Sequence, residues 1–203
     1  MRSRILIWMG AALFAAALSG AAEAALLIDD FDGGTTNKMG LRSSTYSQEP
    51  SKALAVRGKE DAKKTGLGGL VLKYDKKNSG GPYDSGGWCG YYTLLKKGTQ
   101  YFDAKPYKKI TFWVKGETGA ENFVLGLADK HWDEAGDSVK SEPIGKYLPG
   151  GKVTTQWQKA EVPLEDFLVD AGEIGSIAFC FESTVFPEGE GKGTIHVDDL
   201  MLE

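Results

Sequence analysis

Histidine and cysteine are scarce in this chain of 203 residues, which has two of each. His131 and His196 leave almost no material for histidine-based metal ligation or acid–base catalysis. Neither Cys89 nor Cys180 has a histidine near it in sequence, so neither has the setting of a nucleophilic thiolate. No Ser-His-Asp order, phosphate loop or CxxC motif is visible, and no motif singles out a carboxylate pair for glycoside hydrolysis. The sequence therefore predicts a protein that is not an enzyme.

The chain also lacks an excess of positive charge, because 24 Lys and Arg stand against 28 Asp and Glu, a net charge of −4. Nucleic acids and anionic membranes need clustered positive charge, so neither is an expected partner. Hydrophobic residues make up 41% of the chain, enough to bury a full core, and one domain is expected at this length. The 27 glycines favour a fold with many tight turns over a helical bundle.

One apolar run, Ile5–Leu18, follows two arginines, and residues 22–24 have the small-x-small pattern of a cleavage site. The pattern predicts a secretory signal peptide over residues 1–24 and a mature domain over 25–203. The run is too short to cross a hydrocarbon core of ~30 Å comfortably, and no second apolar stretch of about 20 residues follows. We therefore expect no membrane span in the mature chain and a secreted or periplasmic location.

Export bears on the two cysteines. An oxidising compartment permits a disulfide between Cys89 and Cys180 if their strands are neighbours. The alternative is two separately buried thiols that act as small apolar side chains. The sequence leaves both open.

Short apolar or alternating segments, separated by Gly, Pro, Asn, Asp and Ser clusters, recur from residue 25 to the C-terminus. The expected strands cover residues 25–31, 67–74, 88–95, 109–115, 122–129, 158–162, 176–182 and 194–202. The polar stretch 33–65 is expected to hold one more, irregular strand near residues 44–48. No segment has the sustained 3.6-residue period of a core helix. Such an array predicts an all-β fold, a two-sheet β-sandwich of the jelly-roll type.

Strand alternation predicts which side chains face outward. Over residues 109–115, Ile110, Phe112 and Val114 form an apolar row, which places Trp113 on the opposite face. The strands at 122–129 and 176–182 carry mostly small residues opposite their apolar rows. These residues are Val124, Gly126, Ala128, Ala178 and Cys180. If the three strands share a sheet, its outer face is a shallow depression with Trp113 as its aromatic floor.

Five strings occur in order along nearly the whole predicted mature chain. They are Ile28-Asp29-Asp30-Phe31-Asp32-Gly33-Gly34, Gly86-Gly87-Trp88, Ile110-Thr111-Phe112-Trp113-Val114-Lys115-Gly116, Trp157-Gln158 before Val162-Pro163-Leu164, and Gly193-Thr194-Ile195-His196-Val197-Asp198-Asp199-Leu200. In this order they resemble the galactose-binding-like β-sandwich domains that include carbohydrate-binding module family 11 and the domains related to complex I intermediate-associated protein 30. The resemblance implies a jelly roll, a non-catalytic role and extracellular glycan binding.

Sugar binding in water relies on aromatic faces that stack against the C–H patches of pyranose rings, with polar side chains taking up the hydroxyls. The predicted ligand-binding residues are Trp88, Tyr92, Trp113, Trp132 and Asp129. Trp132 is the most suggestive, because an indole in a polar loop is hard to explain as core, whereas Trp88 has core filling as its alternative. The expected partner is a polysaccharide or glycoconjugate. The alternative function is an envelope protein whose aromatic face binds another protein.

Carboxylates gather near both ends of the domain, and the first and last strands are expected to lie close together. Calcium needs six to eight oxygen ligands, which two chain segments could supply jointly. The resemblance implies such a site, because related sandwiches often hold a structural calcium between an N-terminal acidic residue and the first Asp of a C-terminal pair. Those positions are Asp32 and Asp198 here. The alternative is solvated carboxylates at strand ends.

Overall fold

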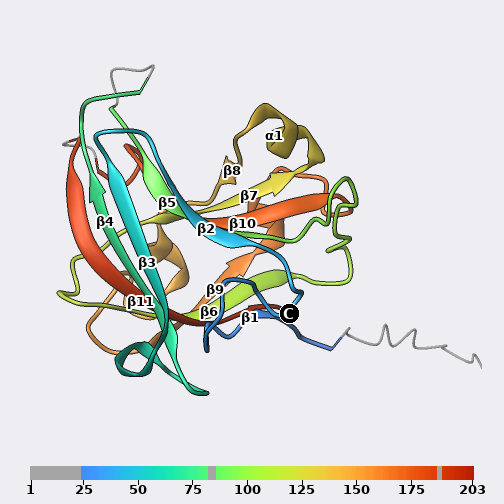
Figure 1. The fold of residues 1–203 in the computed structure, drawn as a ribbon, viewed down its shortest axis with the longest axis horizontal. Helices are drawn as coiled ribbons and strands as arrows, with labels where there is room; N and C mark the ends of the chain where they lie inside the picture. Colours follow the sequence, from blue (N-terminus) through green and yellow to red (C-terminus); the bar gives the residue numbers. More distant parts are fainter. Residues whose placement is uncertain (1–23, 82–85, 187–188) are drawn as a thin grey trace, which may run out of the picture.

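The computed structural model describes residues 24–81, 86–186 and 189–203, so the predicted signal peptide lies outside the described residues except for its last residue, Ala24. Two antiparallel sheets pack face to face (Figure 1). One contains, in order, β3 (Lys52–Lys59), β4 (Gly69–Lys76), β11 (Gly191–Leu202), β6 (Lys109–Gly116) and β9 (Gln158–Pro163), with β1 (Leu26–Asp29) paired to β11. The other contains β2 (Ser43–Ser47), β5 (Cys89–Leu94), β10 (Ile174–Phe181), β7 (Val124–Asp129) and β8 (Val139–Lys140). The predicted all-β sandwich is confirmed.

The helices are short. An α-helix, α1 (Lys130–Ala135), follows β7, and three 3₁₀ turns are η1 (Glu60–Ala62), η2 (Ile144–Tyr147) and η3 (Leu164–Asp166). Within the described ranges, no helix is long and apolar enough to cross a membrane.

Alternating side chains of the two sheets form the core. Ile110, Phe112 and Val114 of β6 are fully buried, as their alternation predicts. The Phe112 ring meets the Phe179 ring of β10 edge to face, with centroids 5.2 Å apart. Burying each such side chain stabilises the fold by about 1.5–3 kcal/mol, so these rows hold the two sheets together.

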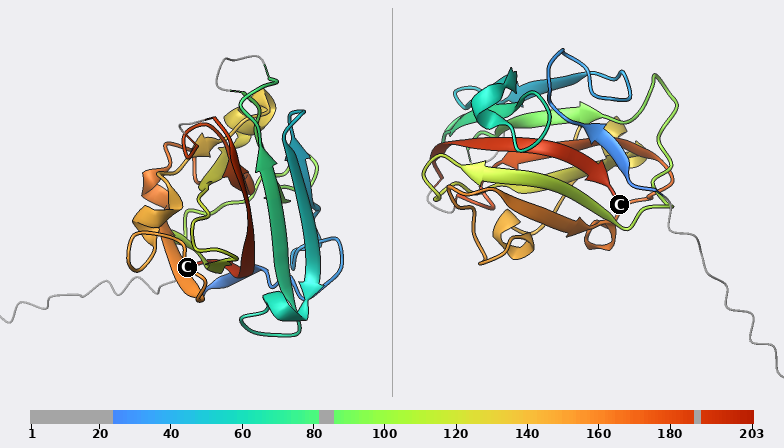
Figure 2. Two further views of the ribbon diagram at one scale, coloured as in Figure 1. Left: turned by 90° about the vertical axis from the view of Figure 1, so that its left-hand side faces the viewer. Right: turned by 90° about the horizontal axis from the view of Figure 1, so that it is seen from below.

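The long strand β11 lies at the centre of the six-stranded sheet. It runs between β4 and β6, and β1 pairs with its C-terminal end through Leu26 and Leu202 (Figure 2). The first and last strands are therefore neighbours, as expected for a jelly roll of this type.

Strand β3 was not expected in the polar stretch after residue 33. Its larger apolar side chains, Leu54 and Val56, face solvent with 59% and 36% of their surface exposed, whereas Ala53 and Ala55 pack inward. The strand therefore presents no apolar row of the kind that marks a core strand. The expected irregular strand near residues 44–48 exists as β2.

The two cysteines lie on neighbouring strands but on opposite faces. Phe181 is opposite Cys89, and Cys180 is opposite Gly90, so the two thiols are offset by one residue. Cys89 belongs to the core and Cys180 to a small cluster on the outer face. Both are free and buried, and burial raises the pKa of Cys89 to about 11. The alternative of two separate thiols is the one the structure shows.

Candidate functional site

The outer face of the five-stranded sheet is hollowed into a groove of about 840 Å³, called the sheet groove below. Its floor comes from the central strands β10 and β7, where Ser176 lies opposite Ala128. Next along β10, Ala178 lies between Tyr92 of β5 and Gly126 of β7. Small side chains at the centre leave depth for a ligand, and larger ones stand around it.

Two tyrosines border the groove on the β2 and β5 side. The Tyr46 and Tyr92 ring centroids are 6.5 Å apart. Tyr46 lies opposite Gly90, where an added Cβ would be 2.6 Å from the Tyr46 hydroxyl oxygen. The absence of a side chain at Gly90 therefore lets the Tyr46 ring lie across the strand. Burial raises the pKa of Tyr46 well above its usual value, so the hydroxyl stays protonated.

Trp88 borders the groove just before β5 begins. Its carbonyl oxygen accepts a hydrogen bond from the Gln48 amide at 2.8 Å, which continues the pairing of β2 with β5. Cys89, the next residue, faces the core, so the alternation of the strand turns Trp88 outward, to the same face as Tyr92. Its indole is partly exposed, unlike a core filling.

Trp132 borders the groove from α1, a helix where the sequence predicts a polar loop. Asp129 caps this helix: one carboxylate oxygen accepts from the Trp132 amide at 3.0 Å, the other from the Asp170 amide at 2.8 Å. Gly136 ends the helix with a φ of 73°. Asp129 is buried, at 7% exposed, so its carboxylate positions Trp132 instead of facing the groove.

Charged groups fixed by their neighbours complete the lining. Asp133 binds the Lys96 ammonium and accepts from the Tyr101 hydroxyl at 2.9 Å. The Lys140 Nζ atom lies 2.8 Å from an Asp137 carboxylate oxygen and 3.9 Å from a Glu182 one. Burial lowers the pKa of Lys140, but Cys180, Asp137 and Glu182 outweigh it, so the pKa is raised overall. Their ion-pair and hydrogen-bond partners already orient these donors and acceptors, and charged groups of this kind favour hydrogen bonds to hydroxyl groups.

The expectation that Trp113 lies beside the small-residue strands is wrong. Strand β6 belongs to the other sheet, where Trp113 lies opposite Asp198 on one side and Lys159 on the other. The Lys64 ammonium lies 4.6 Å from the centroid of its ring. The strands β7 and β10 do share a sheet, as supposed, but Tyr92 is the aromatic residue next to their small side chains.

The two carboxylates expected to hold calcium converge on one loop, residues 63–68. Asp32 accepts from the Leu67 and Gly68 amides at 2.6 and 2.8 Å. Asp198 accepts from the Lys64 and Thr65 amides at 2.6 and 2.9 Å. The Gly68 amide helps lower the pKa of Asp32, whereas burial raises that of Asp198. Among the described residues, no group of three or more His, Cys, Asp or Glu side chains is placed to hold a metal.

The chain is a two-sheet β-sandwich with a groove bordered by aromatic rings on the outer face of one sheet. The family described as Carbohydrate binding domain 30 matches residues 31–202, and the chain belongs to this family. The prediction of a non-catalytic carbohydrate-binding β-sandwich is thereby confirmed. No curated protein matches the chain.

Solved structures show the same fold. The family 11 carbohydrate-binding module of the cellulosomal cellulase Lic26A-Cel5E of Clostridium thermocellum is 21% identical, with a TM-score of 0.63 over 88% of this chain and 93% of that chain. A family 11 module from Clostridium thermocellum in complex with a β-1,3-1,4-mixed-linked tetrasaccharide is 20% identical, with a TM-score of 0.63 over 88% and 94%. A β-1,2-glucanase from Parabacteroides distasonis is 16% identical, with a TM-score of 0.54 over 87% of this chain and 24% of that one.

Proposed function

We propose that the sheet groove binds a neutral β-glucan chain by stacking sugar rings on Trp88, Tyr92 and Trp132. The observation that carries the proposal is that the three rings surround one floor of small side chains. Trp88 lies just before β5, Tyr92 lies in β5 and Trp132 lies in α1. The volume of the sheet groove, about 840 Å³, falls within the usual range of ligand sites, about 300–1,000 Å³. Asp129 takes part indirectly, because it holds the helix that presents Trp132.

The charges of the lining favour a neutral polysaccharide over an acidic one. Asp133, Asp137 and Glu182 line the groove with Lys140, so acidic groups outnumber basic ones. A uronate-bearing chain would bring further negative charge next to these carboxylates, which costs free energy. A family 11 module of the same fold was solved with a β-1,3-1,4-mixed-linked tetrasaccharide, which makes mixed-linked glucan the first ligand to test.

Export belongs to the proposal as well. The N-terminal apolar run after two arginines supports it, and polysaccharides are met outside the cytoplasm. Expression in a secreting bacterial host should give a mature protein that begins at Ala25. A full-length mass in the exported fraction would contradict cleavage there.

A structural calcium between Asp32 and Asp198 is a further proposal. It is supported by the convergence of both carboxylates on loop 63–68 and by the pairing of β1 with β11. The ion would be coordinated by carboxylate oxygens of the two residues, which now accept hydrogen bonds from backbone amides of this loop. Asp32 and Asp198 are the residues that would hold it.

Affinity electrophoresis and calorimetry with mixed-linked β-glucan test the groove. Tyr92→Ala and Trp132→Ala should each weaken binding about 10-fold or more, because a ring in a binding centre contributes about 1.4 kcal/mol or more. Trp113→Ala is the matched control: it removes an indole from the other sheet and should keep wild-type affinity. Equal losses of affinity in all three variants, with unchanged melting temperatures, would contradict the proposal that the sheet groove is the binding site. No binding by the wild type, with concentration-dependent dimers, would favour a protein partner on this aromatic face.

A further inference from the structure

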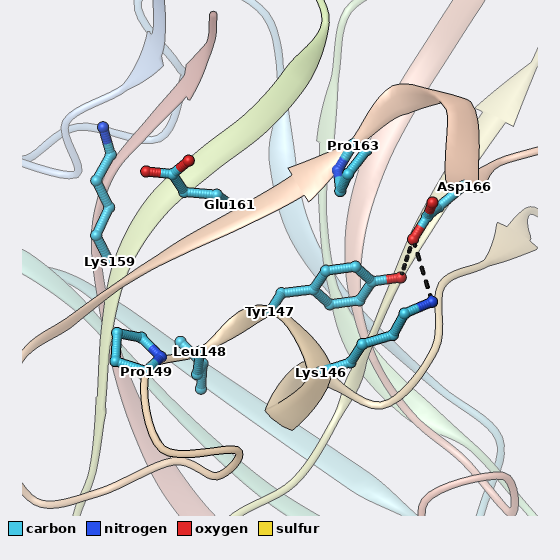
Figure 3. Close-up of a pocket in the computed structure, with 8 residues that line it drawn as sticks. All are labelled: Lys146, Tyr147, Leu148, Pro149, Lys159, Glu161, Pro163 and Asp166. Atoms are coloured by element: carbon cyan, nitrogen blue, oxygen red, sulfur yellow. Dashed lines mark hydrogen bonds and ion pairs between the residues drawn. The ribbon is translucent and has the colours of Figure 1, made fainter.

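A second hollow, of about 560 Å³, lies at the free edge of the six-stranded sheet, between the edge strand β9 and the turns η2 and η3 (Figure 3). We call it the edge hollow. The Tyr147 ring lies in its middle, with Lys159 and Glu161 of β9 on one side and Lys146 and Asp166 on the other. Leu148, Pro149 and Pro163 add apolar surface to the lining. The edge hollow and the sheet groove share no lining residue.

The backbone around the edge hollow is firmly held. The Leu148 amide donates to the Gly145 carbonyl at 3.2 Å, which closes η2. The Leu164 amide donates to the Lys108 carbonyl at 2.8 Å, which ties the start of η3 to the sheet. Pro149 and Pro163 have φ restrained by their rings. A ligand would therefore meet walls that need little ordering on binding.

Polar atoms lie on both sides of the tyrosine ring. The Tyr147 hydroxyl donates to Asp166 Oδ2 at 2.7 Å, and Lys146 Nζ lies 3.5 Å from the same oxygen. The hydrogen bond from Tyr147 lowers the pKa of Asp166, which keeps it a carboxylate acceptor near neutral pH. Burial and the Asp166 carboxylate raise the pKa of Tyr147 to about 12, so its hydroxyl remains a donor.

The opposite side is also charged and paired. Lys159 Nζ lies 2.8 Å from Glu203 Oε1, and Lys109 Nζ lies 2.8 Å from Glu161 Oε2. Both sides of the hollow therefore offer charged hydrogen-bonding groups whose positions are set by their partners. Such groups bind hydroxyls more strongly than neutral ones do.

The chemistry of this lining selects a class of ligand. Its two lysines, Lys146 and Lys159, balance its two acids, Glu161 and Asp166, so an ion of either sign meets a like charge as well as an opposite one. A neutral ring with an apolar face and peripheral hydroxyls can use the Tyr147 ring, the proline surface and the paired charges together. We propose that the edge hollow is a second saccharide-binding site, which takes a short stretch of neutral glycan independently of the sheet groove. The proposal rests on the proposed function for the class of ligand.

Two independent sites have a functional consequence. A module that holds polysaccharide at the sheet groove and at the edge hollow can engage two strands, or two parts of one strand. Retention on a polymer would then exceed that expected from the stronger site alone, because the second contact forms at high local concentration.

The test is an NMR titration of ¹⁵N-labelled mature protein with the β-1,3-1,4-mixed-linked tetrasaccharide, which needs no variant. We expect two sets of amides to shift with different midpoints. One set includes Tyr92 and Ala178 in the sheet groove; the other includes Leu148 and Leu164 at the edge hollow. Shifts confined to the groove set at saturating ligand would overturn the second site and leave the proposed function intact.

Variants then separate the two sites. Tyr147→Ala should abolish the shifts at Leu148 and lower retention on mixed-linked glucan polymer about 3-fold or more, with the groove midpoint unchanged. Tyr147→Phe, which keeps the ring, should weaken the second midpoint only a few-fold. Leu168→Ala is the matched control, because it truncates a side chain that is 88% exposed, follows η3 and lines neither hollow.

The failures are distinguishable. If Trp132→Ala removes only the groove shifts and Tyr147→Ala only the edge shifts, both proposals stand. If the edge shifts remain while Tyr92 and Trp132 variants bind like the wild type, the groove proposal fails and the edge hollow stands. If Tyr147→Ala changes neither the edge shifts nor polymer retention, the edge hollow is not the second site.

Discussion

The outer faces of the two sheets carry similar aromatic material but differ in what surrounds it. On the five-stranded sheet, the central strands contribute Ser176, Ala178 and Ala128, and the rings stand around an open groove. On the six-stranded sheet, Trp113 and Trp157 each lie under a lysine ammonium, at 4.6 and 5.1 Å from the ring centroids. A lysine ammonium also lies against the Tyr147 ring of the edge hollow, 5.4 Å from its centroid. The small neighbours of the rings are therefore what distinguishes the sheet groove from the other sheet.

The loop at residues 63–68 accounts for much of this difference. Its backbone amides bind Asp198 on the outer side of β11, and Lys64 from the same loop reaches the Trp113 ring. On the five-stranded sheet, no such loop is among the described residues that line the groove. Helix α1 lies at the border of the groove instead and presents Trp132. Around Trp113 the six-stranded sheet is therefore covered by its own chain, whereas the sheet groove on the other sheet is left open to a partner.

The largest expected effect on affinity comes from filling the groove floor. Ala178→Leu should reduce affinity for mixed-linked glucan 10-fold or more, because the longer side chain takes up space that a sugar ring would need. Thr194→Leu is the matched control: Thr194 is also 7% exposed, but faces outward on the six-stranded sheet. Calorimetry should show wild-type affinity for the control. If both variants bind with similar affinity, at equal melting temperatures, the outer face of the five-stranded sheet is not the one that binds glucan.

Calcium removal is expected to lower stability instead of affinity, and it should act on the six-stranded sheet alone. If calcium is present at 100 times its dissociation constant, chelation costs about 2.7 kcal/mol, which lowers the melting temperature by about 5–10 °C. Asp32→Ala should abolish the difference between chelated and calcium-loaded protein. Groove affinity should not change. If the wild-type melting temperature is the same with and without chelator, the proposed calcium site is wrong.

The smallest expected effect concerns the cap of α1. Asp129→Ala removes an acceptor of the Trp132 amide and should cost about 1 kcal/mol of unfolding free energy, or about 2–4 °C in melting temperature. Affinity should also fall a few-fold, because the helix that presents Trp132 frays. Asp103→Ala is the control, since Asp103 accepts the exposed Lys105 amide outside both hollows. An Asp129→Ala variant with lower stability but unchanged affinity would show that Trp132 needs no positioning.

The missed elements have local explanations. Helix α1 is too short to show a helical period, although Asp129 before it and Gly136 after it are typical cap residues and could have indicated it. Strand β3 turns its alanines inward and its larger apolar side chains toward solvent. A core strand has the reverse arrangement, so the alternation does not indicate a core strand here. Tyr46 was not singled out, because nothing near it in sequence shows that Gly90 lies opposite and leaves space for its ring.

The sequence by itself determined most of the strands, the core rows such as Ile110, Phe112 and Val114, and the class of fold, because alternation and turn residues act over a few neighbouring positions. Only the tertiary structure decided that Trp113 and Tyr92 lie on different sheets. Pairing joins strands that are far apart along the chain, and the alternation of one strand carries no information about its neighbour. The groove depends on that pairing, which sets small side chains of β7 and β10 beside the rings of β5 and α1.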